Sequence, residues 1–188
     1  MNAKTDTSDK SNRGPWIHTW GGGRFYYLDP NPEEVFIEDI AHALSLQCRF
    51  NGHTTLHYSV AEHSILVSDM VYSKTNDVEV AMAALLHDAA ETYIGDVVSP
   101  LKTLLTEFKQ VEARVEKCVA AKFGLDYPWD EEIHLADKAV LAMEFRSVAP
   151  FADEDMARAP LSSTNSERRF LEKYAHLSAL RDGSRDKG

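Results

Sequence analysis

Residues 79–91 read EVAMAALLHDAAE, and this stretch decides the fold. Its run of small and aliphatic side chains predicts a buried helix. The run ends in His87 and Asp88, two side chains that commonly ligate metals, although an unpartnered polar group is costly to bury. The dipeptide alone is common, so its meaning depends on what the rest of the chain supplies.

Two further residues complete a possible metal site. His63 lies upstream in HYSVAEHSILVSDMV, and Asp137 lies downstream in EEIHLADKAVLAMEFR. Asp137 shares a helical stripe with apolar residues, where metal ligation would remove the cost of burying its charge. We therefore predict that three separate helices bring His63, His87, Asp88 and Asp137 together around one divalent metal.

The ligand types narrow the choice of metal. Imidazole nitrogen and carboxylate oxygen together suit zinc, cobalt, manganese, iron or nickel, whereas magnesium prefers oxygen ligands alone. Ligands from separate helices leave coordination positions for water and substrate, as a catalytic site requires. Each of the four residues taken singly could equally be an ordinary exposed or salt-bridged side chain.

Composition excludes several classes of protein. The chain has 188 residues, 44% of them hydrophobic, which is enough for one compact domain. Its net charge of −10 disfavours binding to nucleic-acid polymers. No apolar run reaches the roughly 20 residues of a membrane span. Without CxxC spacing or a signal-peptide core, we expect a reduced, cytoplasmic protein, either bacterial or phage-encoded.

The periodicity predicts an all-α bundle of about six helices. We expect polar, disordered tails at residues 1–14 and 183–188 around a single domain at residues 15–182. An aromatic-rich arm or short hairpin comes first, between Trp16 and Pro32. Helices are expected over residues 37–48, from Ser59 onward, and over 78–91, 102–123, 130–148 and 164–182, with a loop at 150–163.

Local signals set the helix ends. Ser59 with Glu62, and Thr164 with Glu167, have the spacing of capping boxes. Gly124 is expected to stop the helix over residues 102–123. Within that helix, the near-heptad stripe that we assign to the core begins with Leu104 and Leu105.

The motifs SVAEHS (59–64), LLHDAAETYIGDVVSPLK (85–102) and LADKA (135–139) resemble the HD-domain metal-dependent phosphohydrolase superfamily. They are most similar to its compact branch, which includes bacterial 5'-deoxynucleotidases. The resemblance spans residues 16–148 and implies an all-helical HD domain in which the four residues named above ligate the metal. It also implies a symmetric homo-oligomer.

Two carboxylates inside this pattern are candidate catalytic residues. Glu91 follows Asp88 by three residues, which puts both on one helical face, so that Glu91 could orient an attacking water. The resemblance implies that Asp96 assists at the phosphate, by positioning water or by protonating the leaving oxygen. Alternatively, Glu91 is a supporting or surface carboxylate, and Asp96 is a turn residue or a helix cap.

A phosphate substrate needs cations beyond a metal whose charge two aspartates cancel. Arg49 and Lys102 are the candidates, and Arg49 aligns with an arginine–aromatic pair of the resembled nucleotidases. Its planar guanidinium can hold two phosphate oxygens at once. Either residue could instead be a surface charge.

Trp16 and Trp20 could stack on a nucleobase, although such aromatics more often cover the bundle. The segment that holds them resembles small bacterial and phage HD proteins, some of which are dATP triphosphohydrolases. The sequence therefore favours a deoxynucleotide hydrolase that releases triphosphate from dATP, with additional divalent ions on the substrate.

Three alternatives remain open at this point. The first is a 5'-deoxynucleotidase acting on deoxynucleoside monophosphates. The second is a non-enzymatic nucleotide-binding module in which the metal is only a staple. The third is a di-metal oxygenase, which the lack of additional histidines between His87 and Asp137, other than His134, disfavours.

Overall fold

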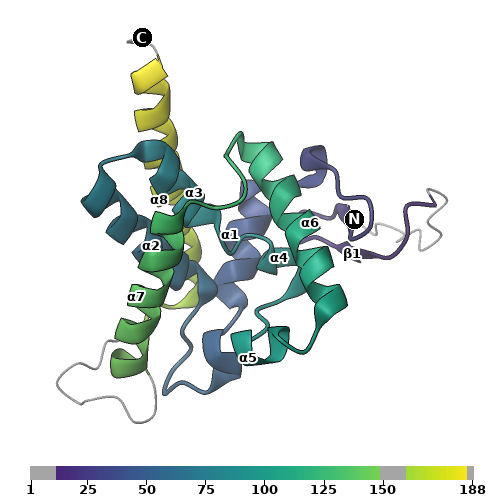
Figure 1. The fold of residues 1–188 in the computed structure, drawn as a ribbon, viewed down its shortest axis with the longest axis horizontal. Helices are drawn as coiled ribbons and strands as arrows, with labels where there is room; N and C mark the ends of the chain where they lie inside the picture. The colour runs from purple at the N-terminus through teal and green to yellow at the C-terminus, as the bar shows by residue number, and fades with distance from the viewer. Residues whose placement is uncertain (1–11, 149–159, 186–188) are drawn as a thin grey trace.

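The computed structural model describes residues 12–148 and 160–185, and in them the predicted all-α architecture is confirmed (Figure 1). The longer helices are α1 (Ile37–Leu46), α2 (Val60–Thr75), α3 (Val78–Leu86), α6 (Thr106–Phe123), α7 (Glu131–Ser147) and α8 (Ser163–Arg185). The one-turn helices are α4 (Glu91–Ile94) and α5 (Ser99–Lys102), and the 3-10 helices are η1 (Pro32–Glu34) and η2 (Arg49–Gly52).

The aromatic arm is a short antiparallel hairpin of β1 (Trp16–His18) and β2 (Arg24–Tyr26). Gly22 occupies its turn at φ +86°, a left-handed conformation that glycine adopts without strain. Phe25 is fully buried and stacks on Tyr93 of α4, with ring centroids 3.7 Å apart. The arm is thereby fixed to the bundle next to the short helix α4.

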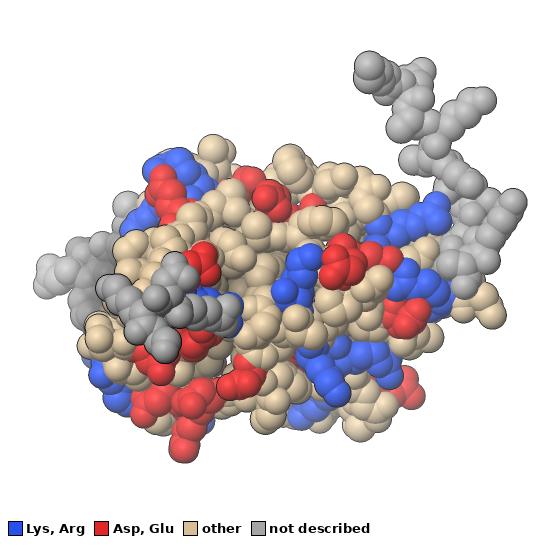
Figure 2. Space-filling view, turned by 90° about the horizontal axis from the view of Figure 1, so that it is seen from above, with Lys and Arg blue, Asp and Glu red and all other residues tan. Residues whose placement is uncertain are grey.

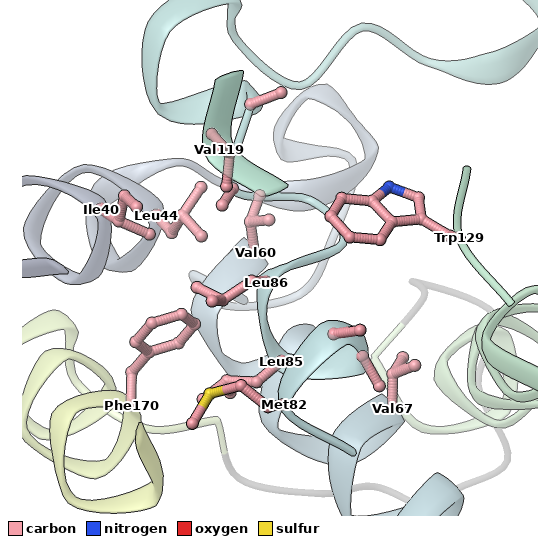
Figure 3. Packing of buried hydrophobic residues seen from close by; sticks show 14 of the residues in the cluster. Ile40, Leu44, Val60, Val67, Met82, Leu85, Leu86, Val119, Trp129 and Phe170 are labelled. Carbon is pink, nitrogen blue, oxygen red and sulfur yellow. The ribbon is translucent and has the colours of Figure 1, made fainter. Parts of the chain in front are cut away.

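Helix α2 is central to the bundle and packs against α1, α3, α7 and α8 (Figure 1). Apolar side chains from these helices and from α6 meet in one core (Figure 3). Among them, Leu44, Val60, Leu86, Val119 and Phe170 are fully buried. Because α2, α3 and α7 share this core, the residues that they carry at its edge have fixed positions.

The helix predicted over residues 78–91 is interrupted. Helix α3 ends at Leu86, and tight i→i−3 bonds follow, from Ala89 N to Leu86 O and from Glu91 N to Asp88 O. His87 Nδ1 donates to Ala84 O, the carbonyl that an uninterrupted helix would pair with the N–H of Asp88. The HD dipeptide therefore lies in a turn between α3 and α4.

The long helix predicted over residues 102–123 is also shorter than expected. It begins at Thr106, after the separate turn α5, and its buried residues start only at Val115. Leu104 and Leu105 are 76% and 38% exposed, so assigning them to the core was wrong. Gly124 ends the helix in the left-handed conformation, at φ +62°, as predicted.

One of the two predicted capping boxes has the expected N-cap. Ser59 Oγ accepts from the Glu62 amide at 3.2 Å, as predicted. Thr164 is not the other cap, because α8 begins at Ser163 and Ser162 Oγ accepts from the Asn165 amide at 3.4 Å. Two serines precede Thr164, and the first of them performs the capping.

Parts of both predicted tails lie among the described residues. Arg13 pairs with Asp29 at 2.8 Å and with Glu34 at 2.5 Å, and helix α8 continues beyond Gly183. The rest of both predicted tails, and most of the predicted loop at 150–163, lie outside the described residues.

The surface charges are mixed in sign. On the face drawn in Figure 2, basic side chains of the described residues are bordered by acidic ones and form no continuous basic stripe. That face lacks the surface that tracks a phosphodiester backbone. Within residues 12–148 and 160–185, no helix is both long and apolar enough to cross a membrane.

Because α6 begins at Thr106, two leucine substitutions should have different effects on the free energy of unfolding. Leu86→Ala removes a fully buried side chain and should lower the free energy of unfolding by about 2–5 kcal/mol. Leu104→Ala should change it by less than about 0.5 kcal/mol, because the side chain is already largely in water. Urea denaturation measures both, and an equal loss in the two variants would contradict this helix boundary.

Candidate active site

Three of the predicted metal ligands meet at the junction of α2 and the turn after α3. One ligand atom from each of His63, His87 and Asp88 lies within 4.8 Å of the others, so that they could hold one metal ion. Asp137 approaches from α7, with Oδ1 3.1 Å from His63 Nε2. The structure thus brings together residues that are far apart in the sequence.

Hydrogen bonds fix the orientation of both imidazoles. His63 Nδ1 lies 2.7 Å from Glu144 Oε1, and His87 Nδ1 lies 2.8 Å from Ala84 O. Because the Ala84 carbonyl can only accept, His87 Nδ1 carries the proton. The Glu144 carboxylate likewise favours a proton on His63 Nδ1, so that both Nε2 lone pairs can face a metal.

The Nε2 atoms provide a test of whether a metal fits. Both are buried. Each faces a carboxylate oxygen, His63 Nε2 at 3.1 Å from Asp137 Oδ1 and His87 Nε2 at 3.3 Å from Asp88 Oδ1, but among the described residues neither makes a hydrogen bond of good geometry. Buried polar atoms are normally paired, because an unpaired one loses its hydration without compensation. Two such nitrogens beside two carboxylates form the mixed donor set that suits a divalent transition metal.

The carboxylates in this cluster are held ionised. Burial alone would raise the pKa of Asp137, but the close contact with His63 and the positively charged or polarised groups around it, among them Arg49, lower it to about 2. The side chain of Asp137 is 38% exposed, so it is less enclosed than the sequence pattern suggested. It opens onto a cavity beside the cluster.

That cavity has a volume of about 540 Å³, within the usual range for small-molecule sites. Glu91, Asp96, Arg49 and Lys102, the predicted catalytic and phosphate-binding residues, all line it, together with Asp88 and Asp137. Its apolar lining comes mainly from Phe50, Val97, Val98, Pro100, Leu141 and Phe145.

Glu91 and Asp96 bring excess negative charge to this cavity. Burial, then the charges of Asp88 and Asp96, raise the pKa of Glu91 well above its ordinary value. Burial also raises the pKa of Asp96, against the opposing charge of Arg49. Burial of a carboxyl group favours its protonated form, and acid–base catalysis requires groups that can gain and lose a proton.

The two basic residues of the cavity already have acidic neighbours. Lys102 Nζ is 2.6 Å from Glu112 and 3.5 Å from Glu91. Arg49 is buried, with NH2 3.0 Å from Glu144 Oε2 and NH1 3.7 Å from Asp88. Its Nε is buried and has no hydrogen-bond partner among the described residues.

Trp16 and Trp20, the predicted nucleobase-stacking residues, lie away from the cavity lining. Neither is among the residues that line the cavity. Arg24 covers the ring of Trp16, and Trp20 is 64% exposed and stacks on His42 with centroids 4.4 Å apart. The aromatic faces at the cavity belong instead to Phe50 and Phe145, whose centroids are 5.0 Å apart.

Sequence reasoning missed the roles of Glu144 and Tyr58. Glu144 is 2% exposed and contacts His63, Arg49 and the Tyr58 hydroxyl, which donates to Oε1 at 2.9 Å. A usable signal existed, because Glu144 follows Asp137 by seven residues, two helical turns along the same face of α7. A carboxylate at that spacing among apolar residues predicts a buried partner for its charge.

Metal binding can be tested directly. Protein stripped by a chelator should bind one divalent transition-metal ion per chain, and His87→Ala should abolish tight binding because it removes a buried donor. Asp137→Ala should weaken binding. His176→Ala, on the exposed face of α8, is the matched control. Elemental analysis after equilibrium dialysis measures the stoichiometry, and full metal content in His87→Ala would refute this ligand set.

Comparison with known proteins agrees with this site. The family model described as 5'-deoxynucleotidase YfbR-like matches residues 49–140, a range that includes the four predicted ligands. The uncharacterized protein YfdR of Escherichia coli K12 is 35% identical, over 88% of this chain and 97% of that protein. An uncharacterized protein of Rhodobacter capsulatus is also 35% identical, over 76% of this chain and 78% of that protein.

These matches confirm the resemblance inferred from the motifs. HD-domain hydrolases of this kind use divalent metals and act on nucleotides, in agreement with the His-Asp cluster beside the cavity. The chain therefore belongs to the YfbR-like 5'-deoxynucleotidase family and is a metal-dependent phosphohydrolase of the HD-domain superfamily.

Proposed function

We propose that the protein is a 5'-deoxynucleotidase that hydrolyses deoxynucleoside 5'-monophosphates to a deoxynucleoside and phosphate. One observation carries the proposal: a single cavity of about 540 Å³ is lined by metal-cluster residues, two cations and two carboxyl groups with raised pKa values. Those are the parts that hydrolysis of a phosphate ester needs.

Charge favours a monophosphate over a triphosphate. Arg49 and Lys102 are the basic residues among those that line the cavity, against the four carboxylates Asp88, Glu91, Asp96 and Asp137. A triphosphate would bring additional negative charge with no further basic side chain in that lining to receive it. The arm that favoured dATP in the sequence contributes nothing to the lining, and the family match favours the monophosphate.

A bound divalent ion would supply an acidic water and withdraw charge from the phosphate. His63, His87, Asp88 and Asp137 would hold it. Arg49 would orient the phosphate through its guanidinium, and Lys102 would add charge at the cavity wall. Both cations would stabilise the negative charge that develops on the phosphate oxygens.

The two acidic side chains then have distinct tasks. Glu91 would orient the attacking water and accept its proton, supported by its burial beside Asp88. Asp96 would donate a proton to the leaving 5'-oxygen, supported by its raised pKa. Assembly into a homo-oligomer stays a prediction.

A substrate screen tests the proposal. Deoxynucleoside mono- and triphosphates are incubated with manganese, cobalt, zinc or magnesium, and products are separated by charge. We expect inorganic phosphate from monophosphates and little or no triphosphate from triphosphates. Release of triphosphate as the main product would overturn the proposal in favour of a dATP triphosphohydrolase, and tight nucleotide binding without any product would favour a binding module.

The roles of the cavity residues predict different kinetic losses. Glu91→Gln and Asp96→Asn should each lower kcat by about 100-fold or more, with smaller changes in KM, because they remove proton transfer. Arg49→Lys should mainly raise KM, because a point charge replaces a two-pronged donor. Glu107→Gln, exposed at the start of α6, is the control. Unchanged kcat in Glu91→Gln would eliminate its proposed role.

A further inference from the structure

We propose that Glu144 is a positioning residue that couples the metal site to phosphate binding, because its two oxygens orient different parts of the active site. Oε1 lies 2.7 Å from His63 Nδ1 and accepts from the Tyr58 hydroxyl at 2.9 Å. Oε2 accepts from Arg49 NH2 at 3.0 Å. One buried carboxylate thereby contacts both a metal ligand and the phosphate-binding arginine.

On the metal side, Glu144 determines which nitrogen of the His63 ring can bind the metal. The carboxylate attracts the ring proton to Nδ1 and leaves the Nε2 lone pair pointing at the metal cluster. His63 is fully buried, so water cannot replace Glu144 as the partner of Nδ1 without rearrangement. Partners of this kind commonly change metal affinity by about 10–100-fold when they are removed.

On the phosphate side, Glu144 fixes the position of Arg49. Its contact uses NH2, and Arg49 lines the cavity, so the guanidinium is held beside the space that a phosphate would enter. An arginine held in this way loses less conformational entropy when it binds phosphate than a freely rotating one does. Glu144 also balances the guanidinium charge inside the protein before the substrate arrives.

Glutamine cannot replace this carboxylate, although it is nearly the same size. Its amide has one oxygen and one NH2 group, whereas His63 Nδ1–H, the Tyr58 hydroxyl and Arg49 are all donors. If the amide oxygen faces His63 and Tyr58, the NH2 group faces the guanidinium. Glu144→Gln must therefore disturb at least one side, because one of the donors loses its acceptor.

The experiment measures two equilibria on the full-length protein. A competing chelator gives the dissociation constant of a divalent metal such as manganese or zinc. Calorimetry gives the dissociation constant of inorganic phosphate, both for metal-free and for metal-saturated protein. Glu144→Gln and Arg49→Lys are compared with Asp39→Asn, which alters a carboxylate that is also 2% exposed but lies on α1 and contacts the Gly21 amide.

We expect Glu144→Gln to weaken metal binding about tenfold or more. Phosphate binding should weaken about tenfold, even in metal-free protein, because a hydrogen bond to a charged group is lost. Arg49→Lys should weaken phosphate binding alone. Asp39→Asn should change neither constant, whatever it does to stability as measured by urea denaturation.

The coupling is refuted if Glu144→Gln folds and changes neither constant, or changes only one of them. If that variant does not fold, Tyr58→Phe decides, because it removes only the hydroxyl that anchors Glu144. Tyr58→Phe should then weaken both constants by about threefold, and unchanged constants would overturn the inference.

The inference rests on the proposed function for the role of Arg49 at a phosphate, but its test does not require turnover. If no monophosphate is hydrolysed and the two dissociation constants still move together, the proposed function fails and the coupling stands. If monophosphates are hydrolysed and only one dissociation constant changes, the proposed function stands and the coupling fails.

Discussion

The site depends on burying two imidazoles in a single orientation each. His63 and His87 each have Nδ1 beside an acceptor, Glu144 and the Ala84 carbonyl, and each turns a buried Nε2 toward a carboxylate oxygen without a hydrogen bond of good geometry among the described residues. That arrangement costs free energy unless a metal ion binds between these atoms. The core formed by α2, α3 and α7 stabilises the fold enough to keep it, and metal binding would repay the cost.

The sequence predicts the long helices well, because their apolar periodicity and caps act locally. It fails where tertiary contacts override the pattern. Helix α3 stops at Leu86 because the His87 ring takes the Ala84 carbonyl, and Leu104 is exposed because the chain turns after α5 before α6 begins. Neither event has a local signal as strong as Gly124, which ends α6 through its own backbone freedom.

In the candidate site, too, local signals predict some residues and tertiary contacts determine the others. Ligand chemistry and motif spacing suffice to propose His63, His87, Asp88 and Asp137, which the structure brings together. The partners of those residues are harder to predict, since Glu144 reaches Arg49 from a position 95 residues away. The sequence predicts that aromatic residues of the arm stack on the nucleobase. The aromatic side chains at the cavity are instead Phe50 and Phe145, because only the fold determines which segments meet there.

Charge balance connects the site to its substrate. Glu144 pairs with Arg49 and Glu112 with Lys102, so both cations of the cavity are partly neutralised by the protein itself. A divalent metal would balance Asp88 and Asp137, which leaves Glu91 and Asp96 as the surplus acids. The raised pKa of Asp96 favours its protonated form, in agreement with its proposed role as a proton donor, whereas Glu91 must be ionised to accept a proton and lies 3.5 Å from Lys102 Nζ. A single phosphate can enter such a site near neutrality, whereas each further phosphate would require a cation that the lining does not supply.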